Sequence, residues 1–206
     1  TTAGAQMAIK QGPVNKPGRA RYASTGEILF ANSGANQVCK IDKSGMVGFE
    51  GTSGNYVRWI YNKFVDPKHL LRSGQPTSLR GPTDAIMWQE MEPPASTTGG
   101  TSSQPGTSVV HCLIADSGNS RIVDLVYRVR AGQFVDFENN PITKPGPYID
   151  PDSGFVMPEL NWVTKTDSLN ERYAFDCLQL VAAPRQNVTD PFRQDIWVAC
   201  SNYAAK

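Results

Sequence analysis

Apolar and β-branched residues alternate with polar ones over short stretches, and clusters of turn-forming residues separate these stretches. Residues 27–31 and 36–42 lie on either side of an Asn-Ser-Gly turn, and residues 109–115 and 119–125 lie on either side of an Asp-Ser-Gly turn. Alternation on both sides of a turn signal is typical of a β-hairpin. Residues 195–202 repeat the first half of this pattern. The pattern therefore predicts two hairpins and part of a third.

The three stretches repeat at a constant interval. Ala31, Ala115 and Ala199 hold the same place in each and are separated by 84 residues in both cases. The other motif positions are Asn32, Gly34, Asp116, Gly118, Asn119, Arg121 and Asn202. Asx side chains bond their own backbone in turns and glycine accepts positive φ, which predicts tight turns that use the two glycines for this purpose. Arg121 and Gln37 hold equivalent places and are expected to tie each hairpin to its neighbour.

Further apolar stretches complete a sheet around each hairpin. Residues 19–24, 83–89 and 174–181 precede the three motifs and are predicted to be inner strands. Residues 56–61 and 160–164 follow the first two motifs and are predicted to be outer strands. The first two units are thus each expected to be a sheet of four antiparallel strands, while the third stops after its second strand.

The stretch Ala-Asp-Ser-Gly-Asn-Ser-Arg-Ile at residues 115–122 resembles the core of NHL repeats. The match is weaker in the first unit and weakest in the third, where Cys200 stands in place of the Asp. NHL repeats are four-stranded blades of a β-propeller. The resemblance therefore implies an all-β chain of propeller blades, with an incomplete ring and long loop insertions.

The expected organisation is an N-terminal arm at 1–17 followed by a partial propeller at 18–206. The blades are expected at about 18–66, 67–165 and 166–206, the last incomplete. An interval of 84 residues is about twice the usual 40–50 of propeller repeats. Either a degenerate blade lies between successive units, or loop insertions lengthen each unit. We favour insertions, of which the polar stretch 93–107 is the clearest.

A ring of fewer than three blades leaves a strand edge without a partner, which is a template for pairing. Three explanations remain open. The chain is a fragment of a longer protein, it completes its ring with another chain or copy, or it forms an open stack covered by its loops.

Composition narrows the classes of partner. The formal net charge is +1 and no run of Lys or Arg is present, which argues against binding nucleic acid. No apolar run is long enough to predict a membrane span.

Catalytic signatures are few. The chain contains no GxSxG, P-loop or HExxH motif. Ser117 is interpreted as a turn residue, and His111, the nearest candidate base, has no orienting acid that the sequence identifies. Asp84, Asp116 and Asp176 are a weak candidate calcium set, although solvated or turn-capping roles are favoured. We therefore expect no catalysis and no cofactor.

The four cysteines are Cys39, Cys112, Cys177 and Cys200, and none is part of a CxxC pair. Two interpretations carry equal weight: buried core thiols, or one or two disulfides in a secreted protein. Four cysteines allow three pairings, between which spacing does not choose.

Aromatic residues suggest a contact surface. The candidates are Tyr56, Trp59, Tyr61, Trp162, Tyr173 and Tyr203. Tyr and Trp are enriched at protein interfaces, while packing between blades is the alternative. The leading hypothesis is a secreted or cell-surface assembly module that binds other protein chains or copies of itself through loops and an open strand edge. The alternatives are a calcium-dependent propeller enzyme of the lyase or lactone hydrolase type and an RNA-binding NHL module.

Overall fold

A computed structural model describes residues 15–22, 28–41, 57–92, 106–164, 177–182 and 196–200. These residues form strands and two short 3₁₀ turns, and the described part of the chain contains no α-helix. None of its helical segments is long and apolar enough to cross a bilayer. The strands are β1 (Pro17–Tyr22), β2 (Ile28–Asn32), β3 (Gln37–Ile41), β4 (Val57–Tyr61), β5 (Asp84–Glu92), β6 (Thr107–Asp116), β7 (Arg121–Arg130), β8 (Gln133–Val135), β9 (Glu159–Val163), β10 (Cys177–Ala182) and β11 (Ile196–Cys200). The 3₁₀ turns are η1 (Ser33–Ala35) and η2 (Ser117–Asn119).

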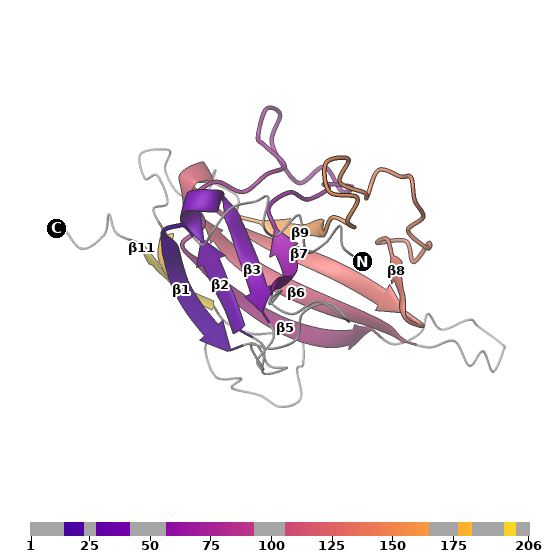
Figure 1. Ribbon diagram of the computed structural model, residues 1–206, viewed down its shortest axis with the longest axis horizontal. Coiled ribbons are helices and arrows are strands. Elements are labelled where there is room, and N and C mark those ends of the chain that lie inside the picture. The colour runs from indigo at the N-terminus through magenta and orange to yellow at the C-terminus, as the bar shows by residue number, and fades with distance from the viewer. Residues whose placement is uncertain are drawn as a thin grey trace.

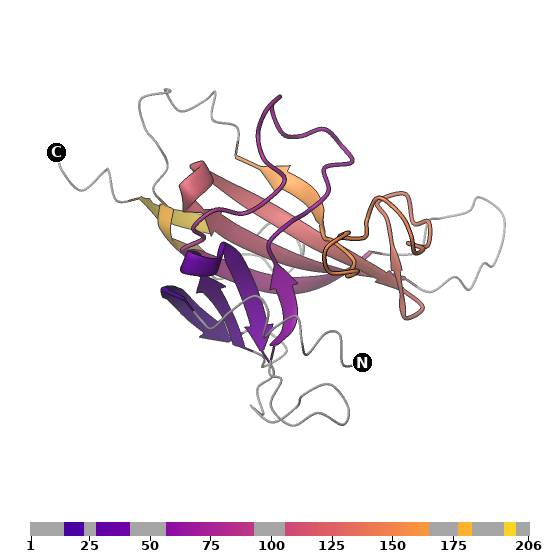
Figure 2. The same cartoon turned by 45° about the horizontal axis from the view of Figure 1, so that its top comes forward.

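The strands form three antiparallel sheets, which confirms the all-β prediction. The first sheet has the order β1-β2-β3-β4 and the second the order β5-β6-β7-β8, with β9 also paired to β7. The third consists of β10 and β11. Figures 1 and 2 show the short strands of the first sheet lying against the longer strands of the second. The predicted hairpins and outer strands are therefore present.

The prediction of uniform four-stranded blades is wrong for the second sheet, which has five strands. Two short strands share the edge of β7: β8 pairs with its last residues, and β9 pairs with Val123 to Val126. The described strands do not close into a ring. The predicted arm at 1–17 overlaps β1, which begins at Pro17, and its first fourteen residues lie outside the described residues. The loop at 93–107 also lies mostly outside them, and Thr107 already belongs to β6.

The repeat is reproduced in the strand register. Leu29 faces Lys40 in the first sheet, and Leu113 faces Asp124 in the second. In each sheet the second residue of this pair is in turn the register partner of a tryptophan on the neighbouring strand: Lys40 pairs with Trp59, and Asp124 pairs with Trp162. The strand pairing therefore identifies the same equivalent positions in the two sheets as the sequence repeat does.

The main core lies between the first two sheets. The first contributes Leu29, Val38 and Tyr61, all at most 1 % exposed. The second contributes the side chains on the facing side of β5, β6, β7 and β9, among them Cys112, Ile114, Val123, Leu125 and Leu160, which are fully buried. Burying a Leu, Ile or Val stabilises the fold by about 1.5–3 kcal/mol per side chain. Strand alternation places every second residue of β6 in this core and leaves the intervening ones on the opposite face.

Polar contacts join the inner strands of the first two sheets. Arg21 of β1 donates from Nε to Oδ1 of Asp84 at 2.9 Å, and Asp84 is 0 % exposed. The backbone N–H of Arg19 donates to the carbonyl of Thr83 at 3.2 Å. The strands β1 and β2 lie beside β5, and β5 and β6 in turn lie beside β10. The same neighbour relation thus occurs twice along the chain.

The turns use their glycines differently from the prediction. The residues with positive φ are Asn36 (56°) and Ser120 (52°), while Gly34 and Gly118 do not have it. Gly118 is needed because a Cβ there would lie 2.6 Å from the carbonyl oxygen of Arg80. The glycine requirement is therefore one of close backbone approach.

Candidate functional site

The repeat motif is a structural tie in the second sheet. Asp116 accepts a hydrogen bond from the backbone N–H of Arg80 at 2.7 Å and, through its other oxygen, from Nε of Arg121 at 2.7 Å. The second oxygen also accepts from the side-chain amide of Asn119 at 2.8 Å. Arg121, 1 % exposed, donates onward to the carbonyls of Pro76 and Ser78. These contacts attach the hairpin to the segment that leads into β5. The polar groups of the motif residues are therefore used to hold the fold together.

The first sheet builds the same turn with neutral groups. Asn32 accepts from the backbone N–H of Asn15 at 2.7 Å, and Gly34 donates to the carbonyl of Asn15 at 2.8 Å. Gln37, at the place of Arg121, accepts from the thiol of Cys39 at 3.3 Å. Of the third unit's motif residues, Ala199 lies in β11 facing Gln179, and Asn202 lies outside the described residues.

The candidate calcium ligands do not converge on one site. Arg21 engages the carboxylate of Asp84 and Arg121 engages that of Asp116, while Asp176 lies outside the described residues. Within the described ranges, no group of three or more His, Cys, Asp or Glu residues is placed to hold a metal ion.

The aromatic candidates fall into different environments. Tyr61 is 0 % exposed and packs on Tyr127 with ring centroids 5.6 Å apart, so its assignment to a contact surface is corrected to a core position. Trp162 is 49 % exposed on β9. Trp59 is described by its backbone register alone, and Tyr56, Tyr173 and Tyr203 lie outside the described residues. Trp162 is therefore the candidate that the structure places at the surface.

Two of the four cysteines are buried free thiols. Burial raises the pKa of Cys39 to about 12 and also raises that of Cys112. Because the thiolate is the reactive form, neither is suited to nucleophilic chemistry near neutral pH. Cys177 and Cys200 are Cα partners across the β10–β11 pair.

A row of polar and aromatic side chains crosses the second sheet on the face opposite the main core. We call it the aromatic–polar stripe, and its residues are Trp88 on β5, His111 on β6, Asp124 on β7, and Asn161 and Trp162 on β9. Trp88 is the direct register partner of His111, and Asp124 that of Trp162. Direct partners in antiparallel strands share a face, so the ladder itself assembles the stripe.

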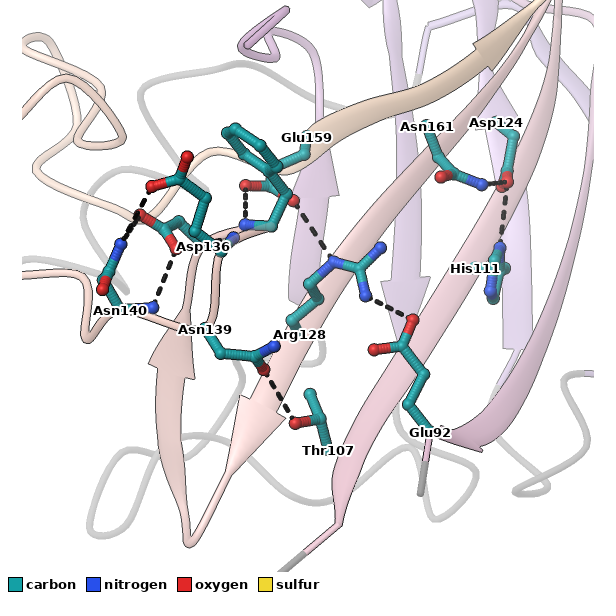
Figure 3. A network of polar contacts seen from close by, with 12 residues as sticks. Glu92, Thr107, His111, Asp124, Arg128, Asp136, Asn139, Asn140, Glu159 and Asn161 are labelled. Atoms are coloured by element: carbon teal, nitrogen blue, oxygen red, sulfur yellow. Dashed lines mark hydrogen bonds and ion pairs between the residues drawn. The ribbon is translucent and has the colours of Figure 1, made fainter. Parts of the chain in front are cut away.

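Hydrogen bonds hold the centre of the stripe. His111 Nδ1 lies 2.9 Å from Oδ2 of Asp124, and the side-chain amide of Asn161 donates to the same oxygen at 2.8 Å (Figure 3). The pairing of β7 with β9 shifts by one residue at this point, which places Asn161 within reach of the carboxylate. The ring of Trp88 stacks on His111 with centroids 4.7 Å apart and planes 5° apart. The imidazole is thus held on one side by stacking and at one nitrogen by a carboxylate.

The stripe also contains an incompletely satisfied group. Asp124 is 6 % exposed, and its Oδ1 has no hydrogen-bond partner among the described residues. A buried carboxylate oxygen without a donor is unfavourable, because the group has lost water without replacing it. That oxygen is itself buried, so a partner at the surface does not supply the missing donor. A carboxylate-oriented histidine is also the arrangement of a general base, but no Ser, Thr or Cys nucleophile is hydrogen-bonded to this ring among the described residues.

A second polar cluster lies farther along β7 on the same face. Arg128 lies between Glu92, 2.5 Å from Nη1, and Glu159, 3.5 Å from Nε (Figure 3). Glu159 also accepts from the backbone N–H of Phe137 at 2.8 Å, and burial raises its pKa. The cluster attaches the loop after β8 to the sheet, which is a structural role.

The sequence contained a signal for the acid beside His111 that its analysis missed. Once the turn pairs Asp116 with Arg121, the hairpin register places Val126 opposite His111 and Asp124 two residues away on the same face. Diagonal neighbours of this kind are within reach of long side chains. Trp162 was identified from the sequence, whereas Asn161 was not, because the pairing of β9 with β7 depends on a long-range contact.

Comparisons with protein families, with curated proteins and with solved structures find no match to this chain.

Proposed function

We propose that this protein is a non-catalytic binding and assembly module, and that the aromatic–polar stripe is its contact face. The observation that carries the proposal is Trp162, which is 49 % exposed on β9 at the end of the stripe, next to Asn161, whose amide is fixed by Asp124. Exposed tryptophans beside polar groups are frequent anchors of protein interfaces.

The sheets of this module repeat in a propeller-like manner in our proposal, in line with the NHL resemblance. The shared register of the first two sheets supports it, as does the second occurrence of the neighbour relation at β10. If each sheet covers the same face of the one before it, β10 and β11 belong on the stripe face beside β5 and β6, and the exposed Trp162 at the β9 end of the stripe is the part that remains for a partner. In the first sheet the equivalent position, Lys40, is only 7 % exposed.

The proposed occupant is a second copy of the chain or another protein that packs on this face. With a net charge of +1, long-range repulsion between copies is weak. The contact proposed here is a sheet face, in place of the loops and strand edge expected from the sequence. A secreted or cell-surface location remains part of the proposal.

Self-association of the full chain tests it. We expect sedimentation equilibrium to show concentration-dependent association of the wild type and a dissociation constant raised about 30-fold or more by Trp162→Ser, since anchor residues contribute about 2 kcal/mol or more. Phe155→Ser is the matched control, because Phe155 is 46 % exposed on the loop before β9. A wild type that stays monomeric, or equal effects of the two substitutions, contradicts self-assembly through the stripe.

A further inference from the structure

The third sheet departs from the repeat at both members of one cross-strand pair. Cys177 of β10 and Cys200 of β11 are direct Cα partners. Direct partners in an antiparallel ladder have Cα atoms about 4.5–5.5 Å apart. That separation lies within the range of about 4.4–6.8 Å that a disulfide requires.

The same pair in the first sheet is Pro17 and Asn32. Both sheets shift register by one residue directly after it, between Pro17 and Ala20 in the first and between Cys177 and Gln179 in the third. The two pairs therefore occupy the same place, and both of its residues are cysteine in the third sheet.

The residue that Cys200 replaces has a defined task in the other sheets. Asn32 and Asp116 each accept a backbone N–H from the segment before the inner strand, from Asn15 and Arg80 respectively. A thiol is a weak acceptor and is poorly suited to that task. A covalent bond to the inner strand would fix the end of the second strand in place of such a hydrogen bond.

The two remaining cysteines are buried in the other two sheets. Cys39 lies on β3 and Cys112 on β6, both are buried free thiols, and Cys39 donates to Gln37. Spacing alone had left three pairings open, and the register distinguishes one of them.

We propose that Cys177 and Cys200 form one intramolecular disulfide across the β10–β11 hairpin, while Cys39 and Cys112 stay reduced. The co-reactant is a low-molecular-weight disulfide such as oxidised glutathione. One cysteine thiolate attacks it and releases one glutathione thiol, and the second cysteine then attacks the mixed disulfide and releases another. The protein loses two electrons and two protons, and the glutathione disulfide is reduced.

Peptide mapping of the full chain tests the pairing. The protein is equilibrated in a glutathione buffer of oxidising poise, alkylated in denaturant and digested without reduction. We expect one cross-linked peptide that joins residues 177 and 200, together with alkylated Cys39 and Cys112. Four alkylated cysteines, or a cross-link that includes Cys39 or Cys112, would overturn the proposal.

Two double variants provide the control. In Cys39→Ser/Cys112→Ser we expect the cross-link to persist and reduction to lower Tm as it does in the wild type. In Cys177→Ser/Cys200→Ser reduction should leave Tm unchanged. A Tm that responds equally to reduction in both variants contradicts the assignment, and the wild-type peptide map stands even if a variant fails to fold.

Discussion

The first and second sheets build the same turn with different chemistry. In the first, neutral Asn32 holds the backbone of Asn15. In the second, Asp116 holds the backbone of Arg80 and also pairs with Arg121, both side chains being buried. The backbone geometry is shared, since Asn36 and Ser120 both adopt the left-handed conformation directly after the 3₁₀ turn.

This difference shows which part of the motif is general. The acceptor at the end of the second strand and the glycine two residues later serve in both sheets, because the acceptor side chain and the glycine N–H both bond the backbone of the preceding segment. The arginine is an addition of the second sheet, where it reaches the carbonyls of Pro76 and Ser78. The most recognisable residue of the motif is therefore a long-range anchor for one connection rather than a requirement of the turn.

The largest expected difference between the two sheets concerns the buried ion pair of Asp116 and Arg121. Asp116→Ala should lower the free energy of unfolding by about 3–5 kcal/mol, since it leaves a buried guanidinium without its partner. Asn32→Ala removes a neutral acceptor and should cost about 1 kcal/mol. Urea denaturation measures both, and equal losses would contradict the distinction.

The next largest loss of stability is expected at the ion pair that joins the two sheets, between Arg21 and Asp84. Arg21→Met leaves Asp84 buried without its ion pair and should destabilise the protein by about 2–3 kcal/mol, below the fully buried case because Arg21 is 25 % exposed. Arg19→Met on the same strand is the control, because this side chain is exposed and should change stability by at most about 0.5 kcal/mol. Thermal denaturation of both variants shows whether Arg21 matters more than its neighbour.

The two turn glycines should differ by a smaller amount. In Gly118→Ala the new Cβ meets a backbone carbonyl at 2.6 Å, so the chain must shift, at a cost of about 1–3 kcal/mol. In Gly34→Ala it meets the side chain of Asn15, which can rotate away, so the cost should stay below about 1 kcal/mol. Chemical denaturation of the two variants compares them, and a greater loss for Gly34→Ala would show that side-chain rotation does not relieve the contact.

The smallest effect is expected where two connecting loops meet, at a contact between the partly exposed Lys63 and the buried Asp150. Lys63 Nζ lies 3.0 Å from Oδ1 of Asp150. Burial alone would raise the pKa of Asp150, but hydrogen bonds from Ser153 and Lys63 outweigh it and the pKa is lowered. A carboxyl with a lowered pKa adds stability above its ordinary value of 3.8 and loses it as pH falls through the folded-state value.

Lys63→Met should therefore raise the pKa of Asp150 and cost less than about 1 kcal/mol at pH 7, with a smaller difference in acid. NMR titration of the Asp150 carboxyl measures the pKa directly. Lys68→Met, at an exposed lysine of the same segment, should leave that pKa unchanged.

Local pattern accounts for much of the fold. Alternation and turn residues located the hairpins 28–41 and 107–130, because pairing between strands joined by a short turn is set by residues close in sequence. The outer strands were located from their own apolar pattern, and Trp59 and Trp162 proved to hold equivalent register positions. The fifth strand of the second sheet was not anticipated, because three residues of β8 are too few to show a period.

The sequence by itself determined the strands, the turns and the equal interval between them, since these depend on side-chain alternation and on local backbone preferences. Only the tertiary structure decided that Tyr61 is core, that Asn161 reaches Asp124, and that Asp84 pairs with Arg21. The physical reason is that these relations join strands distant in the chain or depend on which face of a sheet another sheet covers. Neither kind of relation can be read from the pattern of hydrophobic and polar residues in a single segment.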